Sequence, residues 1–173
     1  MNGLFKEVQP QDIKDNPFRV IGTDWMLITA GTLKKYNMMT ASWGGWGVLW
    51  HKNVCFCVVR PGRYTYEFME QADYFTLSYF DGTHKEKMKF CGANSGRDVD
   101  KMRLAGLTPA ESTPGCVYFQ EARLVIICKK IYFQQIAPEN FLDKHIEDNY
   151  PQKDYHRMYV GEVTRCFVKS SWQ

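Results

Sequence analysis

Stretches rich in β-branched and aromatic residues recur along the chain, with polar or glycine-rich turns between them. Such stretches are typical of strands that are buried on at least one face. They predict strands at residues 19–33, 37–50, 53–61, 74–80, 115–137 and 157–168, of which 115–137 is long enough for two. In residues 37–50, "NMMTASWGGWGVLW", the glycines are expected to loosen or bulge the strand.

Shorter segments between these strands carry helix signals. The expected helices cover residues 66–73, 87–93, 99–106 and 138–150. Their expected caps are Thr65, a capping box of Thr83 and Glu86, and Asp98, with Gly106 ending the third helix. Because the strands do not alternate regularly with helices, the pattern favours a mainly β protein, a β-barrel with short helical insertions, over a doubly wound sheet.

The chain of 173 residues has the length of one domain, and no repeat or linker divides it. We therefore expect residues 1–173 to form a single domain. Residues 1–17 are polar and are expected to form an N-terminal arm that packs late or against a partner.

Composition and charge narrow the classes of function. The net charge is only +3 and the Lys and Arg residues are scattered, which argues against a nucleic-acid partner and suits a small anionic ligand. The apolar runs are too short to cross a membrane, and the N-terminal stretch lacks the apolar core of an export signal. The six cysteines lack CxxC spacing and the four histidines lack metal-ligand spacing, so we expect free thiols, no metal and a cytoplasmic location.

The first segment with candidate chemistry is "NMMTASW", residues 37–43. On a strand, Thr40 and Ser42 present two hydroxyls on one face, while the small Ala41 leaves the backbone accessible. A planar ligand with amide-like edges needs such access to backbone groups. Taken alone, the two hydroxyls are equally consistent with solvent-facing strand residues.

The second segment is "RPGRYT". Arg60 and Arg63 flank a Pro-Gly turn directly before the helix that Thr65 is expected to cap, and guanidinium donors beside a helix N-terminus suit a phosphate. The plainer interpretation is that Arg63 pairs with Glu67 on the same helix.

The third segment is "NSGRDVDK", where a turn at Ser95, Gly96 and Arg97 precedes Lys101. These residues offer further donors for an anion, although the segment can equally be a loop followed by a helix cap. The residues alone thus predict a β-barrel with turns that suit an anion.

Together with "DYHRMYVGEV" near the C-terminus, these segments resemble the flavin reductase-like family of FMN-binding split β-barrels, and in particular its flavoredoxin-like branch. The resemblance covers about residues 21–168. It implies a Greek-key-like split barrel, a homodimer, and FMN bound near the subunit interface. The "GGWG" stretch replaces a shorter polar stretch of many relatives, so the resemblance leaves the nicotinamide side undefined.

The resemblance also implies a set of cofactor-binding residues. Those beside the isoalloxazine and ribityl chain would be Met38, Met39, Thr40, Ala41 and Ser42, with Trp43 next to them. Those beside the phosphate would be Arg63, Tyr64 and Thr65, with Arg60 nearby. The site would be completed by Ser95, Gly96, Arg97 and Lys101. Donors from Lys101 or Arg97 that face N1 and the C2 carbonyl of the flavin would raise its reduction potential. Trp43 and Trp46 could each wall the flavin, form the dimer interface or fill the barrel.

The function implied by the resemblance is an NAD(P)H-dependent flavin reductase in which hydride passes to flavin N5 and no separate catalytic residue is required. The alternative is a non-enzymatic electron-transfer FMN protein, reduced by a redox partner protein instead of a pyridine nucleotide. A third reading is a β-barrel module that binds another anionic ligand.

Overall fold

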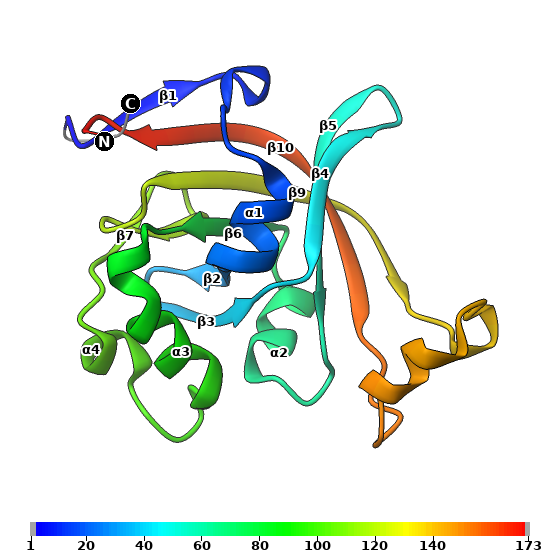
Figure 1. Cartoon of the computed structure of the whole chain (residues 1–173). Coiled ribbons are helices and arrows are strands. Elements are labelled where there is room, and N and C mark those ends of the chain that lie inside the picture. The colour runs from blue at the N-terminus through cyan, green and yellow to red at the C-terminus, as the bar shows by residue number, and fades with distance from the viewer. Residues whose placement is uncertain (1–2, 172–173) are drawn as a thin grey trace.

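The computed structural model describes residues 3–171, and its centre is one large antiparallel sheet (Figure 1). The strands of this sheet are β1 (Phe5–Val8), β2 (Met26–Thr32), β3 (Lys35–Ala41), β4 (Gly44–Leu49), β5 (Lys52–Val59), β6 (Tyr74–Tyr79), β9 (Leu124–Gln135) and β10 (Arg157–Lys169). They pair in the order β3-β2-β6-β9-β10-β5-β4, and β1 pairs with β10. The short strands β7 (Pro109–Glu111) and β8 (Val117–Phe119) form a separate hairpin.

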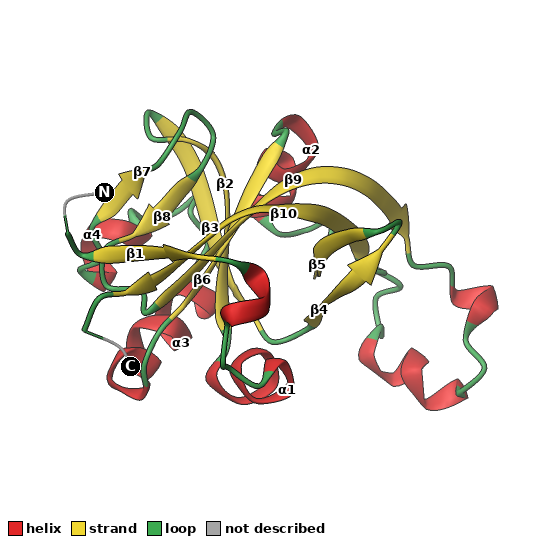
Figure 2. Cartoon of the chain, turned by 90° about the horizontal axis from the view of Figure 1, so that it is seen from above, coloured by secondary structure: helices red, strands yellow, loops and turns green. Residues whose placement is uncertain are grey.

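Short helices are inserted between the strands. The α-helices are α1 (Pro17–Arg19), α2 (Tyr64–Gln71), α3 (Lys85–Ala93) and α4 (Lys101–Ala105). A π-helical turn spans Val20–Asp24, and 3-10 turns span Pro10–Asp12, Gly82–His84, Pro138–Asn140 and Lys144–Asn149. Seen from above, the long strands β9 and β10 curve across the molecule and end in a projection that carries the last two 3-10 turns (Figure 2). This mainly β split barrel with short helices confirms the expected fold class.

Residues 37–50 form two strands, so the prediction of a single loosened strand is wrong. β3 pairs with β2, where Ala41 lies opposite Met26, whereas β4 pairs with β5, where Gly44 lies opposite Cys57. A Cβ atom on Gly44 would lie 2.5 Å from the carbonyl oxygen of Phe56, so only glycine permits this close approach. The chain therefore crosses from one end of the strand order to the other within Ser42 and Trp43.

The predicted strand over 19–33 begins only at Met26. Residues 17–24 are helical instead, because Asn16 caps the turn with its side chain and Pro17 occupies the first helical position. In contrast, residues 115–137 hold the two strands β8 and β9 that their length allowed.

Three expected helix caps are wrong. Helix α2 begins at Tyr64 with Arg63 at the N-cap position, so Thr65 lies inside the first turn. Asp100, not Asp98, caps α4, because its carboxylate accepts a hydrogen bond from the backbone N–H of Arg103 at 3.1 Å.

The N-terminus of α3 also differs from the expected capping box. Asp81 caps the preceding 3-10 turn by accepting from the N–H of Thr83, and α3 itself follows at Lys85. The helix expected over 138–150 is replaced by the two 3-10 turns of the projection. Gly106 ends α4 in the left-handed conformation, as predicted.

Two apolar clusters lie on the two faces of the sheet, as the alternation along its strands requires. On β2, for example, Ile28 belongs to one cluster and Leu27 to the other. Phe5 of β1 is buried in the second cluster, so the N-terminal segment packs on its own sheet through β10.

All six cysteines are free and buried. Cys55 and Cys57 both belong to the first cluster, on the shared strand face that their spacing predicts. Burial raises the pKa of the Cys57 thiol, which keeps it protonated and unreactive. Within residues 3–171 no helix is long and apolar enough to span a membrane, and no three His, Cys, Asp or Glu side chains are placed to hold a metal ion.

Candidate functional site

Strand β3 carries the central segment of the candidate site and lies beside α2 and α3 (Figure 1). Met38 is buried in the second apolar cluster, whereas Met39 and Ala41 pack against the first. This is the alternation predicted for a strand. Asn37, Met39 and Ala41 therefore line one side of β3, and two adjoining hollows open along that side.

The first hollow, here called the Lys101 hollow, has a volume of about 220 Å³. Its walls come from β3, the start of α2, the end of α3 and the loop before α4. Among the predicted site residues it gathers Met39, Arg63, Tyr64, Thr65, Ser95, Arg97 and Lys101. The three segments that carried chemistry in the sequence thus meet at one place, with three cationic side chains and one carboxylate, that of Asp98, in the lining.

Lys101 is the buried cation of this hollow, with 5% of its surface exposed. Its Nζ donates hydrogen bonds to the carbonyl oxygens of Met38 and Cys91, the latter at 3.2 Å. Desolvation by burial lowers the pKa of Lys101 to about 8, with nearby Arg63 lowering it further and Cys91 opposing the shift. An anion in the hollow would stabilise the charged form of this amine.

Cys91 also lines the Lys101 hollow. Burial raises the pKa of its thiol to about 11, although Lys101 and Lys87 act in the opposite direction. The electropositive turn around Cys91 therefore does not yield a thiolate near neutral pH.

Arg63 and Arg97 make different contacts at the mouth of the hollow. Arg63 donates through Nη1 to the carbonyl oxygen of Gly92 at 3.2 Å. Arg97 forms an ion pair with Glu67, and its guanidinium lies 4.8 Å from the centre of the Tyr64 ring. Glu67 therefore pairs with Arg97. The plainer interpretation of the sequence, in which Arg63 pairs with Glu67, is wrong.

Gly96 and Thr65 contribute through close packing around Asn37. The Nδ2 of Asn37 donates to the Oγ1 of buried Thr65 at 2.8 Å. A Cβ atom on Gly96 would lie 2.2 Å from the Oδ1 of Asn37, so the loop can approach β3 only with glycine at this position. Asn37 was not among the predicted site residues, and only its place two residues before Met39, on the same face of β3, would have indicated it.

The second hollow, here called the Trp43 hollow, has a volume of about 240 Å³ and shares Met39 and Arg63 with the first. It also gathers the predicted residues Thr40, Ala41, Ser42, Trp43 and Arg60. The Oγ1 of Thr40 donates to the carbonyl oxygen of Met88 at 2.6 Å and so anchors α3 to β3. Arg97 and Lys101 line only the first hollow, which separates them from the Trp43 side.

The structure does not bring Arg60 into the cationic cluster. Its Nη1 lies 2.7 and 2.8 Å from the two carboxylate oxygens of Asp154, and its Nη2 donates to the carbonyl oxygen of Asn149 at 2.7 Å. The hydrogen bond from Arg60 lowers the pKa of Asp154. Arg60 thus joins the barrel to the β9–β10 projection, with its charge balanced by a carboxylate.

His156 lines the Trp43 hollow and was missed in the sequence. Its ring centre lies 5.0 Å from that of Trp43, and its Nδ1 is 2.9 Å from the hydroxyl oxygen of Tyr150. Desolvation by burial, together with Arg60, lowers the pKa of His156 to about 4, so the ring is neutral at pH 7. Nothing in the spacing of the chain links it to Trp43, because β5 brings the two together by pairing with both β10 and β4.

The two tryptophans left open by the sequence have different roles. Trp43 is 43% exposed and forms a wall of its hollow. Trp46 packs against the first apolar cluster and donates from Nε1 to the hydroxyl of buried Tyr79 at 2.8 Å, so it fills the barrel.

A family model for the flavin reductase like domain matches residues 18–173. The chain therefore belongs to the flavin reductase-like family. No curated protein matches the sequence.

Several solved structures share the fold. A flavoredoxin from Methanosarcina acetivorans is 18% identical with a TM-score of 0.70, over 96% of this chain and 78% of that one. An FMN-binding protein from Thermus thermophilus, solved with bound 1-cyclohex-2-enone, is 16% identical with a TM-score of 0.68, over 96% and 79% of the two chains. The flavoredoxin of Desulfovibrio vulgaris (Miyazaki F) is 21% identical with a TM-score of 0.65, over 96% and 78%.

Proposed function

We propose that this protein binds FMN, with the phosphate in the Lys101 hollow and the isoalloxazine ring in the Trp43 hollow. The observation that carries the proposal is the convergence of Arg63, Arg97 and Lys101 on one small hollow. Arg97 is paired with Glu67, but Arg63 and Lys101 against the single lining carboxylate of Asp98 still leave a net positive charge, and charge-assisted hydrogen bonds from such groups suit a phosphate. The residues present thus fit the charged end of the cofactor.

The Trp43 hollow fits the ring end for a different reason. Trp43 and His156 form an aromatic wall whose histidine is neutral at pH 7. Ala41 also lines the hollow, and its small side chain leaves room for a ring. Ser42 adds a hydroxyl for a polar ring edge. Such a mixture of flat apolar surface and few polar groups is typical of sites for planar ligands.

As its activity we propose an NAD(P)H-dependent flavin reductase. When bound, the flavin supplies hydride acceptance at N5, and the protein contributes position and electrostatics. Lys101 and Arg63 hold the phosphate, which orients the ring against Trp43. The ion pair of Arg60 with Asp154 closes one side of the Trp43 hollow without adding net charge.

Purified protein tests the proposal directly. We expect added FMN to bind and anaerobic NADH or NADPH to bleach its yellow absorbance. Protein without affinity for FMN would overturn the whole proposal, and another anion identified by mass spectrometry of bound small molecules would take its place.

The second candidate is a non-enzymatic electron-transfer protein. It is favoured by the exposed apolar side chains of Val48, Leu49 and Trp50 at the end of β4, because such rows mark protein contact surfaces. Bound FMN that neither nucleotide bleaches, but that a redox partner protein reduces rapidly, would select this candidate.

We also propose a homodimer, which the same exposed row supports, and a cytoplasmic location, which the six free cysteines support. Light scattering on the purified protein should give twice the mass of the 173-residue chain. A monomer at all concentrations would contradict the homodimer and leave the exposed row to another partner.

A further inference from the structure

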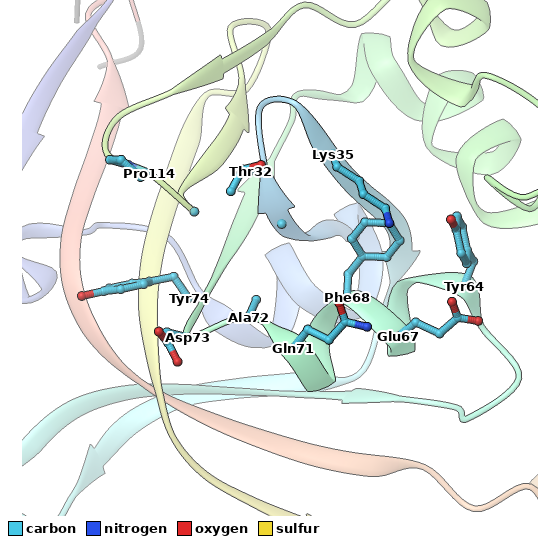
Figure 3. Close-up of a pocket in the computed structure, with 12 residues that line it drawn as sticks. Thr32, Lys35, Tyr64, Glu67, Phe68, Gln71, Ala72, Asp73, Tyr74 and Pro114 are labelled. Carbon is cyan, nitrogen blue, oxygen red and sulfur yellow. The ribbon is translucent and has the colours of Figure 1, made fainter.

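A third cavity lies beside the Lys101 hollow and is here called the Phe68 cavity (Figure 3). Its volume of about 470 Å³ lies within the range of about 300–1,000 Å³ that is usual for small-molecule sites. One wall is the face of α2 formed by Tyr64, Glu67, Phe68 and Gln71, which follow helical spacing. The facing walls come from the β2–β3 hairpin and from the turn between β7 and β8.

One ion pair joins the Phe68 cavity to the Lys101 hollow. Glu67 lines the cavity and Arg97 lines the hollow, and their side chains pair across the boundary. Tyr64 lines both spaces, and the Arg97 guanidinium lies 4.8 Å from the centre of its ring. Each partner of the ion pair therefore belongs to a different ligand space.

This ion pair can be exchanged at little cost. The side chains of Glu67 and Arg97 are 51% and 44% exposed, and ion pairs that are so accessible to water contribute little stability. A cation in the Phe68 cavity can therefore replace Arg97 beside Glu67. The released guanidinium then becomes available to an anion in the Lys101 hollow, which Arg97 already lines.

The lining of the Phe68 cavity favours a small organic cation. Its two carboxylates, those of Glu67 and Asp73, come from α2 and from the residues directly after it, whereas its one cation, Lys35, comes from the facing hairpin (Figure 3). The rings of Tyr64 and Phe68 lie 5.0 Å apart and edge-to-face on the α2 wall, and aromatic ring faces attract cations. An ammonium group on an apolar body matches both features.

We propose that the Phe68 cavity binds a small organic ammonium ion, which strengthens the binding of FMN by displacing Arg97 from Glu67. The inference rests on the proposed function, because it needs the FMN phosphate in the Lys101 hollow. Coupling between two binding sites is reciprocal, so FMN strengthens the binding of the ammonium ion by the same factor.

The test titrates the protein with FMN and with riboflavin, each in the presence and absence of phenethylammonium as the probe. Saturating probe should tighten the binding of FMN about two- to fivefold, which is the range for one exposed ion pair. Riboflavin has no phosphate for the released Arg97, so its affinity should not change. The neutral analogue 2-phenylethanol should have no effect on either ligand.

Two variants of α2 separate the ion pair from a general change of charge. E67Q releases Arg97 permanently, so it should bind FMN about two- to fivefold more tightly than the wild type, and the probe should add nothing further. E70Q is the matched control, because Glu70 lies on the same helix, pairs with Arg157 and lines neither space. It should keep the FMN affinity and the probe response of the wild type.

Calorimetric titration with phenethylammonium alone examines the cavity without any flavin. Three results would overturn the inference while FMN binding stands: a probe that does not bind, a probe that binds without changing FMN affinity, or a probe effect that persists in E67Q. Failure of FMN itself to bind would instead overturn the proposed function, and the coupling with it, even where calorimetry shows that the probe binds.

Discussion

The Lys101 hollow and the Trp43 hollow share Met39 and Arg63, yet they are built in opposite ways. The first gathers three cations, of which only Arg97 has a carboxylate ion-pair partner within residues 3–171. In the second, Arg60 is balanced by Asp154, and the wall formed by Trp43 and His156 is aromatic and uncharged. The two hollows along β3 can thus bind the charged end and the neutral end of one elongated ligand. A substitution in either hollow should weaken binding of the part of the ligand that lies there.

The largest effect is expected from removal of the buried cation. Lys101→Met should weaken FMN by about 2–3 kcal/mol, or about 30- to 150-fold, because a charge-assisted hydrogen bond to a desolvated phosphate is lost. Riboflavin, which has the ring but no phosphate, should bind the variant as it binds the wild type. Titration with both ligands measures the difference, and an equal loss for both would place Lys101 outside the phosphate site.

A smaller effect separates the two arginines of the Pro-Gly turn. Arg63→Ala should weaken FMN by about 1.5 kcal/mol, or roughly tenfold, because Arg63 lies at the more exposed mouth of the hollow. Arg60→Ala is the matched control and should change FMN affinity by less than about twofold, since its guanidinium is held by Asp154. Limited proteolysis should show instead that Arg60→Ala loosens residues 136–156. Equal losses of FMN affinity would erase the distinction between the two hollows.

The aromatic end should behave in the converse way. Trp43→Ala should weaken FMN and riboflavin equally, by about 1 kcal/mol or roughly fivefold, because the stacking surface for the ring is removed. The same paired titration reports it. A loss confined to FMN would place the ring elsewhere.

The pH dependence of FMN binding should also distinguish the two hollows. The pKa of Lys101 is about 8 in the free protein, and a bound phosphate would raise it. FMN affinity should therefore be highest near pH 7 and fall as the pH rises through 8 toward 9.5, while riboflavin affinity stays level. Lys101→Arg should bind FMN without this fall, because a guanidinium does not titrate in that range. A flat profile in the wild type would contradict the assignment.

The smallest effect concerns stability at the aromatic end. His156 has a pKa near 4 in the folded protein against 6.5 unfolded, so its stabilising contribution is present above pH 6.5 and is lost as the pH falls toward 4. The melting temperature of His156→Gln should fall less steeply over this window than that of the wild type. Parallel curves would show that protonation of His156 does not limit acid stability.

The strands and the cationic end were readable from the sequence, because both depend on local pattern. Content of β-branched and aromatic residues indicated β5 and a strand beginning within β3, and "RPGRYT" and "NSGRDVDK" marked the donors that meet in the Lys101 hollow. The break after Ala41 was not readable, because it depends on the approach of Gly44 to Phe56 on the neighbouring strand.

The aromatic end was largely hidden for the same reason. In the sequence Arg60 looks equivalent to Arg63, but in the structure its guanidinium is hydrogen-bonded to Asp154, which lies far along the chain. His156 reaches Trp43 because β5 pairs with both β10 and β4, and local spacing does not indicate that contact. The two hollows therefore differ in charge because of contacts between segments that are distant in the sequence. The local motifs that line them look similar.

Above all, we propose that the Lys101 hollow holds the phosphate of a flavin. The most direct test is a side-by-side titration of the wild-type protein with FMN and riboflavin at pH 7. The account predicts that FMN binds more tightly by at least about tenfold, which is the minimum expected for one charge-assisted contact. Riboflavin that binds as tightly as FMN would contradict it.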